Sequence, residues 1–107
     1  MIRREGRRML LSGPVTLANV AEVLQEGRRH LEEGRRRVDE GLRVVDLGGV
    51  TEMDSALLAL LLAWLRDAQQ RGRPLEFSNL PESLRTIARL YGVDGLLPVA
   101  SEAAASH

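Results

Sequence analysis

The sequence contains no cysteine and no lysine, and each absence narrows what the protein can be. Without cysteine there are no disulfides, no thiolate metal sites and no cysteine nucleophile. All fifteen basic residues are therefore arginine. Arginine suits bidentate contacts with carboxylates or phosphates, but a complete lack of lysine is more typical of a base-composition bias in the coding genome. The formal net charge is zero, so no global field draws the chain toward nucleic acid or an anionic membrane.

A long hydrophobic run is also missing. The ten apolar residues from Ala56 to Leu65 lie between Ser55 and Arg66, whereas a membrane span needs roughly 20 such residues. The first residues, MIRREGRR, are charged and precede no apolar segment of the kind found in a secretory signal. We therefore expect a cytoplasmic protein without membrane insertion. A length of 107 residues suits one compact domain.

Hydrophobic spacing predicts strands that alternate with helices. Three segments have the composition of strands, namely residues 8–13 (RMLLSG), 42–47 (LRVVDL) and 74–79 (PLEFSN). A fourth segment, residues 95–100 (GLLPVA), could add a short strand at the edge of the sheet. A first helix is expected from an N-cap at Thr16 to Gly34, a second from a loop over 48–54 to near Gly72, and a third from Pro81 to Gly92. This order predicts a single α/β domain over residues 1–100, with at least partly parallel strands, followed by a loose tail over 101–107.

The apolar residues of the first and third helices are spaced to form one buried face each. In the first helix the expected buried residues are Leu17, Val20, Ala21, Leu24 and Leu31, and in the third they are Leu84, Ile87, Ala88 and Tyr91.

Few side chains are suited to catalysis. The two histidines, His30 and His107, lie far in sequence from any plausible nucleophile or carboxylate pair, and no GxxxxGK[ST] or GxGxxG motif occurs. Asp46, Glu52 and Asp54 could form an acid/base set, but acids at strand ends and helix starts more often cap backbone amides. We expect neither an enzyme nor a metal or cofactor site.

The second predicted helix has a wide apolar arc. At about 100° per residue, its leucines and Trp64 cover roughly 200° of the helix surface. The remaining strip holds Ala59, Ala63, Arg66 and Gln70, with Ser55 at its head beside Leu62. Within it, Ser55, Ala59, Leu62 and Arg66 lie at spacings of four, seven and eleven residues. One hypothesis is that the strip is merely the outer side of a deeply buried helix. The other is an interface, on which alanine permits close approach and Arg66 pairs with an acid of the partner.

The start of this helix also allows two interpretations. Ser55 or Asp54 could be a structural N-cap, accepting a hydrogen bond from an unpaired helix amide. Alternatively, Ser55 could be modified, because a phosphate there would be stabilised by the helix amides and would add about −1.5 to −2 charge beside Glu52 and Asp54. Capping is the commoner role for an isolated serine of this kind.

Three segments of the chain together resemble a STAS domain over nearly its full length. They are LSGPVTLANVAEVLQEG, LRVVDLGGVTEMDSALLALLLAWL and RGRPLEFSNLPESLRTIARLYGVDGLLP. The resemblance implies a small mixed β-sheet with helices mainly on one face. Asp54-Ser55 matches the Asp-Ser pair of SpoIIAA-type anti-sigma factor antagonists, in which a partner kinase phosphorylates the serine. Leu57 stands where many family members have glycine, a difference that favours a packing role for this helix start over a kinase-substrate role.

The stretch NLPESLRTIARLYGVDGLLP is most similar to the MlaB-type STAS subunits of Mla phospholipid-transport ABC complexes. In those subunits a hydroxyl residue at the Ser55 position contributes to contact with the ATPase subunit MlaF. The resemblance therefore implies a non-catalytic cytoplasmic subunit, peripheral to the inner membrane through its partner, that binds and stabilises an MlaF-like ATPase and through it a permease.

The alternative implied by the resemblance is a partner-switching regulator, in which phosphorylation of Ser55 controls binding to an anti-sigma factor or serine kinase. A weak nucleotide or lipid binder is a third possibility. Under the first two hypotheses the expected partner contacts are Asp54, Ser55, Ala59, Leu62 and Arg66. A second candidate surface comprises Arg85, Arg89 and Tyr91, for which solvated arginines and a tyrosine at the edge of the core are the simpler interpretation.

Overall fold

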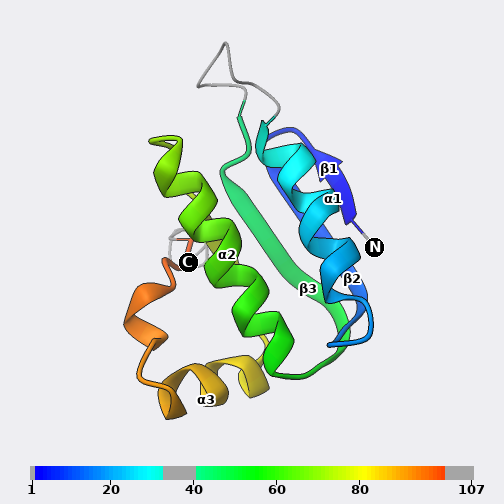
Figure 1. Ribbon diagram of the computed structural model, residues 1–107, viewed down its shortest axis with the longest axis vertical. Helices are drawn as coiled ribbons and strands as arrows, with labels where there is room; N and C mark the ends of the chain where they lie inside the picture. Colours follow the sequence, from blue (N-terminus) through cyan, green and yellow to red (C-terminus); the bar gives the residue numbers. More distant parts are fainter. Residues whose placement is uncertain (1, 33–40, 101–107) are drawn as a thin grey trace, which may run out of the picture.

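The computed structural model describes residues 2–32 and 41–100, in which a four-stranded sheet packs against α-helices (Figure 1). In chain order the elements are β1 (Ile2–Glu5), β2 (Arg8–Val15), α1 (Val20–Glu32), β3 (Val44–Met53), α2 (Ser55–Gln70), β4 (Glu76–Ser78), α3 (Glu82–Leu90) and the single 3₁₀ turn η2 (Asp94–Leu96). The predicted helix end at Gly34 and the predicted tail over 101–107, with His107, lie outside the described residues.

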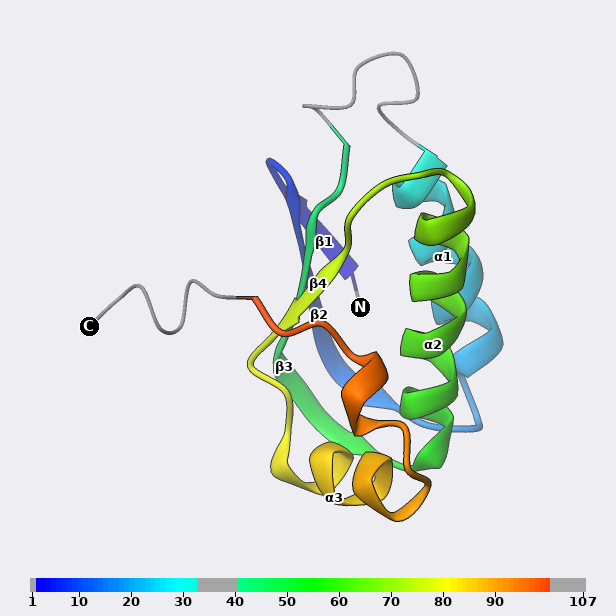
Figure 2. The ribbon, with the colours of Figure 1, turned by 90° about the vertical axis from the view of Figure 1, so that its left-hand side faces the viewer.

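The strand order in the sheet is β1-β2-β3-β4. β1 and β2 form an antiparallel hairpin, whereas β2 pairs with β3 and β3 with β4 in parallel. Parallel neighbours cannot be joined by a tight turn, so α1 and α2 serve as the two crossovers. Both lie on the same face of the sheet (Figure 2). The prediction of a mixed sheet with helices mainly on one face is confirmed.

The core lies between the sheet and α2, whose inward residues are almost entirely apolar. Seven residues of this helix are buried, namely Leu57, Leu58, Leu60, Leu61, Trp64, Leu65 and Ala68. Trp64 is fully buried, and its indole Nε1 donates a hydrogen bond to the Leu24 carbonyl of α1 at 3.2 Å. The wide apolar arc therefore reflects burial against both the sheet and α1.

Two strand predictions are corrected. β1 was not expected, because its sequence IRRE is mostly charged, but as an edge strand it keeps Arg3 and Glu5 exposed. The loop predicted over 48–54 is wrong: β3 continues to Met53. Gly48 and Gly49 suggested a break, yet β3 stays paired with β2 through two register shifts, as β-bulges allow. A Cβ at position 49 would lie 2.9 Å from the Leu11 carbonyl oxygen, so glycine is needed for this close approach.

The first helix begins later than predicted. Thr16 to Asn19 form a turn, in which the Asn19 side chain accepts a hydrogen bond from the Thr16 amide, and α1 starts at Val20. Such local side-chain bonds compete with helix formation. As a result Leu17 is 78% exposed and Ala21 is exposed, while Val23, with Gly27, is buried instead.

The C-terminal elements follow the predictions with two differences. β4 is a three-residue strand within the predicted 74–79, and the predicted edge piece is a single parallel bridge between Val99 and Phe77. α3 buries Leu84 and Ala88 as expected. Tyr91, however, is 65% exposed. It follows the last turn of α3, at the C-cap, and so leaves the buried face.

Candidate functional site

The start of α2 is capped by Asp54. Its backbone is extended, and its carboxylate Oδ1 accepts a hydrogen bond from the Ala56 amide at 2.9 Å. Of the two capping residues considered from the sequence, the structure therefore selects Asp54. This arrangement satisfies one of the helix amides that lack an intrahelical partner.

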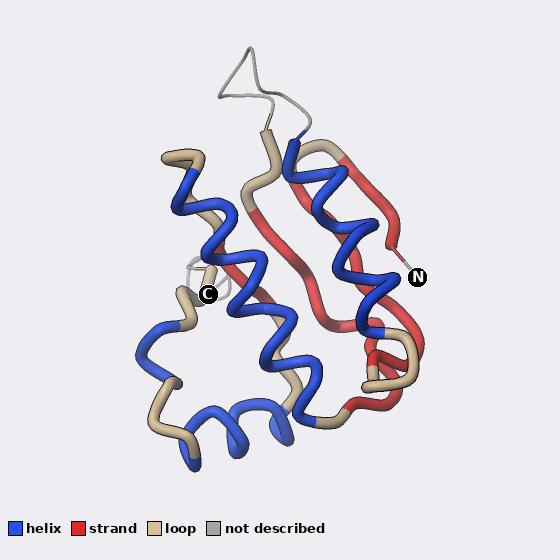
Figure 3. Tube along the Cα trace, viewed as in Figure 1, coloured by secondary structure: helices blue, strands red, loops and turns tan. Residues whose placement is uncertain are grey.

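The second oxygen of Asp54 reaches a distant segment. Oδ2 accepts a hydrogen bond from the backbone amide of Leu17 at 3.0 Å. Leu17 belongs to the turn between β2 and α1, which lies at the same end of the molecule as the start of α2 (Figure 3). The sequence could not indicate this contact, because it joins residues 37 positions apart and the turn was predicted to be helical.

Capping by Asp54 leaves the Ser55 side chain available. Ser55 is exposed, and its hydroxyl has no hydrogen-bond partner among residues 2–32 and 41–100. The neighbouring Leu57 is fully buried, so its side chain points into the core and does not crowd the surface around Ser55. The leucine at position 57 thus places no steric limit on a partner at Ser55.

The predicted strip continues along α2 from Ser55. Ala59 and Arg66 are exposed, and Leu62 is half-buried at the margin. No ion pair joins Arg66 to any residue in the part of the chain that the structure describes. The strip is therefore a narrow surface that begins with a hydroxyl, has a small side chain in the middle and ends with a guanidinium group.

The second candidate surface lies on α3, which packs beside the first turns of α2 (Figures 1 and 2). Arg85, Arg89 and Tyr91 are all exposed. Two further exposed apolar side chains from this region, Leu90 and Leu96, were not predicted. A hollow of about 150 Å³ lies between α3 and the segment after it, lined by Leu80, Arg85, Ala88, Arg89, Asp94, Leu97 and Val99.

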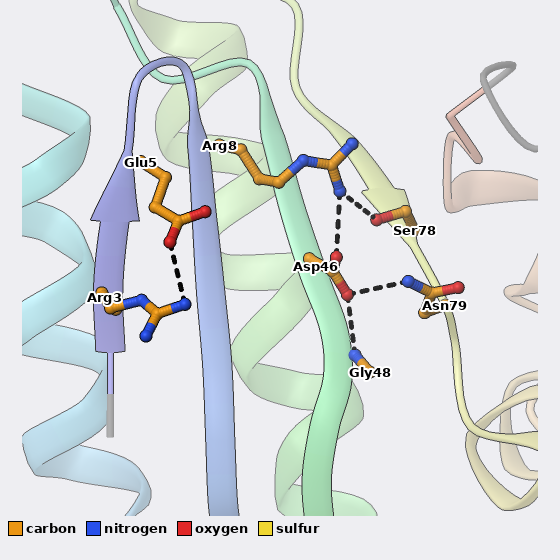
Figure 4. Close-up of polar contacts among 7 residues, drawn as sticks. All are labelled: Arg3, Glu5, Arg8, Asp46, Gly48, Ser78 and Asn79. Atoms are coloured by element: carbon orange, nitrogen blue, oxygen red, sulfur yellow. Dashed lines mark hydrogen bonds and ion pairs between the residues drawn. The ribbon is translucent and has the colours of Figure 1, made fainter.

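The opposite face of the sheet carries a polar network centred on Asp46 (Figure 4). Its Oδ1 accepts hydrogen bonds from the Gly48 amide at 2.8 Å and from Asn79 Nδ2 at 3.0 Å. Its Oδ2 pairs with Arg8 at 3.0 Å, and Arg8 also donates to Ser78 Oγ at 3.1 Å. The network ties β2, β3 and the end of β4 together.

Opposing effects set the pKa of Asp46. Burial of the carboxyl raises the pKa, but the hydrogen bonds from Asn79 and Gly48, with the charge and hydrogen bond of Arg8, outweigh it. The pKa therefore lies below its ordinary value of 3.8. This carboxylate is ionised at neutral pH and is fully engaged by its neighbours, which suits a structural role better than acid/base chemistry.

A shallow hollow of about 280 Å³ lies on the same open face, lined by Arg3, Leu10, Leu11, Ser12, Asp46 and Gly49. Within the described ranges, no group of three or more His, Cys, Asp or Glu side chains is placed to hold a metal ion. The described helices include none that is both long and apolar enough to cross a bilayer.

The mixed sheet, its one-sided helices and the Asp-Ser pair at the start of α2 together define a STAS-type domain, and solved structures share the fold. The anti-sigma factor antagonist SpoIIAA in its unphosphorylated form superposes with a TM-score of 0.63 at 15% identity, over 98% of this chain and 90% of that one. The Bacillus cell fate determinant SpoIIAA in the phosphorylated form gives the same score and identity, over 98% and 94%. A sulfate transporter family protein from Wolinella succinogenes gives 0.60 at 19% identity, over 85% and 70%.

The chain belongs to the MlaB-type STAS family, because the family described as "Mlab, STAS domain" matches residues 2–98. No curated protein sequence matches the chain. STAS domains mediate protein–protein interaction and are generally binding or regulatory domains rather than catalysts.

Proposed function

We propose that the protein is a non-catalytic subunit that binds and stabilises the ATPase of an inner-membrane phospholipid-transport ABC complex. It would act in the cytoplasm, held at the membrane through the ATPase and its permease. The observation that carries this proposal is the Ser55 hydroxyl, which is exposed at the start of α2 and free of the capping role. Membership of the MlaB-type family supports an ABC partner.

The proposed interface runs from Asp54 and Ser55 along Ala59 and Leu62 to Arg66. Ser55 would exchange hydrogen bonds with the ATPase, Ala59 would let the two backbones approach, and Arg66 would pair with a carboxylate. Asp54 contributes mainly by fixing the geometry, because both its oxygens already accept hydrogen bonds.

The surface formed by Arg85, Arg89 and Tyr91 is proposed as a second contact with the same partner. It lies on α3, next to the start of α2, and the exposed Leu90 adds apolar area beside Tyr91. Aromatic and arginine side chains are enriched in binding hot spots. One partner could cover both surfaces without a change in the domain.

The proposal is tested by measuring the affinity of the purified chain for its ATPase when Ser55 is changed. Ser55→Glu places a charged side chain where a hydroxyl contacts the partner, and we expect affinity to fall by about tenfold or more. Ser55→Ala should have a smaller effect. The fold should persist, because an acidic residue in the first helical turn is favourable.

The control is Gln25→Glu, which adds the same charge at an exposed position of α1 that is not among the residues of the proposed interface. It should bind like the original chain. Unchanged affinity of Ser55→Glu would remove Ser55 from the interface, and failure of the original chain to bind any ABC ATPase would reject the proposed function.

A partner-switching regulator is the second candidate. The exposed hydroxyl of Ser55 supports it, as does the shared fold with a protein whose phosphorylated form has been solved. Affinity capture from the native cells, followed by mass spectrometry, separates the two. An ATPase with its permease supports the transporter subunit, whereas a kinase or anti-sigma factor, with phosphate on Ser55, supports the regulator.

A further inference from the structure

We propose that Leu17 is the apolar anchor of the interface and inserts into an apolar recess of the partner that is flanked by basic side chains. Asp54 acts as its positioning residue. The inference rests on the proposed function and adds a contact residue from the turn between β2 and α1, outside the α2 strip and the α3 surface.

The first observation is exposure. Leu17 is 78% exposed, in a chain whose other large apolar side chains on β2, α1 and α2 are buried or half-buried. A single exposed leucine is common on protein surfaces. The relevant feature of Leu17 is that its backbone amide is hydrogen-bonded to Asp54, at the start of α2.

The turn that carries Leu17 is held by several hydrogen bonds. The Thr16 amide donates to Asn19 Oδ1 at 2.9 Å, Asn19 Nδ2 donates to the Pro14 carbonyl at 2.9 Å, and the Ala18 amide donates to Thr16 Oγ1 at 3.3 Å. The Leu17 amide itself donates to Asp54. Because the turn is already ordered, binding through Leu17 costs little further backbone entropy, which is the advantage of a preorganised anchor.

The second observation is proximity to Ser55. The two oxygens of one carboxylate accept from Leu17 and from Ala56, so the turn and the first residues of α2 are fixed to each other. A partner that hydrogen-bonds to Ser55 would therefore meet Leu17 at the same time. An apolar anchor beside a polar contact is typical of the centre of an interface.

The charged side chains near Leu17 indicate which residues should surround the recess on the partner. Glu52, near the end of β3, and Glu22, in the first turn of α1, are exposed. Within the described ranges neither carboxylate has an ion-pair partner. These acids border the Leu17 turn and the start of α2 in the chain, so basic side chains on the partner would complement them.

The test compares Leu17→Ala and Leu17→Ser with the conservative Leu17→Met in binding to the purified ATPase. We expect affinity to fall by about tenfold or more for alanine and serine and to be largely kept by methionine, which retains the apolar volume. Thermal unfolding of all three should match the original chain, because the side chain is exposed. Equal affinity for the serine variant and the original chain would overturn the proposal.

A double-variant cycle tests the positioning role. Asp54→Ser keeps a cap for α2 but cannot hold Leu17 through a second oxygen, so it should weaken binding. Combined with Leu17→Ala, it should add little further loss, since both act on the same contact. Fully additive losses would show that Asp54 does not act through Leu17.

The outcomes separate the two proposals. If Ser55→Glu weakens binding and Leu17→Ser does not, the proposed function stands and Leu17 is not an anchor. If the original chain does not bind the ATPase, both proposals fail. If both variants weaken binding while their unfolding is unchanged, both are supported.

Discussion

At the scale of single residues, the contact between Gly27 and Trp64 decides how closely α1 and α2 pack. A Cβ at position 27 would lie 2.2 Å from Trp64 Cζ2, and Trp64 is fully buried. The indole has little room to move, and its hydrogen bond to Leu24 fixes its orientation. Gly27 thus lets the two helices approach across the tryptophan ring.

Gly27→Ala should therefore destabilise the protein even though alanine favours helix by about 1 kcal/mol over glycine. Overpacking of a full core typically costs about 1–3 kcal/mol, and we expect a net loss in the free energy of unfolding, measured by urea denaturation. Gly95→Ala is the matched control, because a Cβ there meets no atom within 4 Å. Equal stability of the two variants would contradict this account of the helix contact.

Single residues also show what the sequence could and could not predict. The exposed positions of Ser55, Ala59 and Arg66 follow from helical periodicity alone. Leu17 and Tyr91 were assigned to buried faces because the same periodicity was extended past the true ends of their helices. The hydrogen bond of Asp54 to Leu17 depends on how distant segments meet, and no local pattern carries that information.

At the scale of elements, Asp46 holds the sheet together on its open face. Removing its charge with Asp46→Asn weakens the pair with Arg8, so we expect a loss of about 1–2 kcal/mol at neutral pH. Because the pKa is lower in the folded than in the unfolded chain, the stability due to the charge is present above the unfolded pKa and is lost as pH falls through the folded pKa.

The difference in urea stability between the original chain and Asp46→Asn should thus be largest near pH 6 to 7 and shrink below about pH 4. Glu5→Gln is a suitable control, since its ion pair with Arg3 is mostly exposed and contributes little. A difference that does not change with pH would assign the effect to packing rather than charge.

Elements also differ in how readily they are recognised from sequence. The second and third helices were predicted well, because long apolar periodicity, Pro81 and the glycines at 72 and 92 mark them. β1 was missed because an edge strand of four mostly charged residues lacks an apolar signal. The end of β3 was missed because Gly48 and Gly49 are typical of loops, while here they permit close approach within a bulged strand.

At the scale of the whole molecule, the described residues share one continuous core. Buried residues from the sheet, α1, α2, α3 and the C-terminal segment belong to a single cluster. With one core and one tryptophan at its centre, unfolding should be a single cooperative transition.

Thermal unfolding followed by Trp64 fluorescence and by far-ultraviolet circular dichroism should therefore give coincident curves. A tryptophan transition at lower temperature would show that the contact between α1 and α2 opens separately from the sheet. Trp64→Phe, followed by circular dichroism alone, controls for any effect of the indole itself, and it should keep a single transition.

The parallel bridge between Phe77 and Val99, at the edge of the sheet, bears on how the chain folds while it is being synthesised. The Phe77 amide donates to the Pro98 carbonyl, and the Ala100 amide donates to the Phe77 carbonyl, both at 2.8 Å. β4 therefore gains its outer neighbour only after residue 100 has emerged from the ribosome. Until then a nascent chain carries an unpaired edge at β4, on the parallel side of a mixed sheet. Non-local parallel pairing forms slowly, so this edge would stay open to chaperones during synthesis.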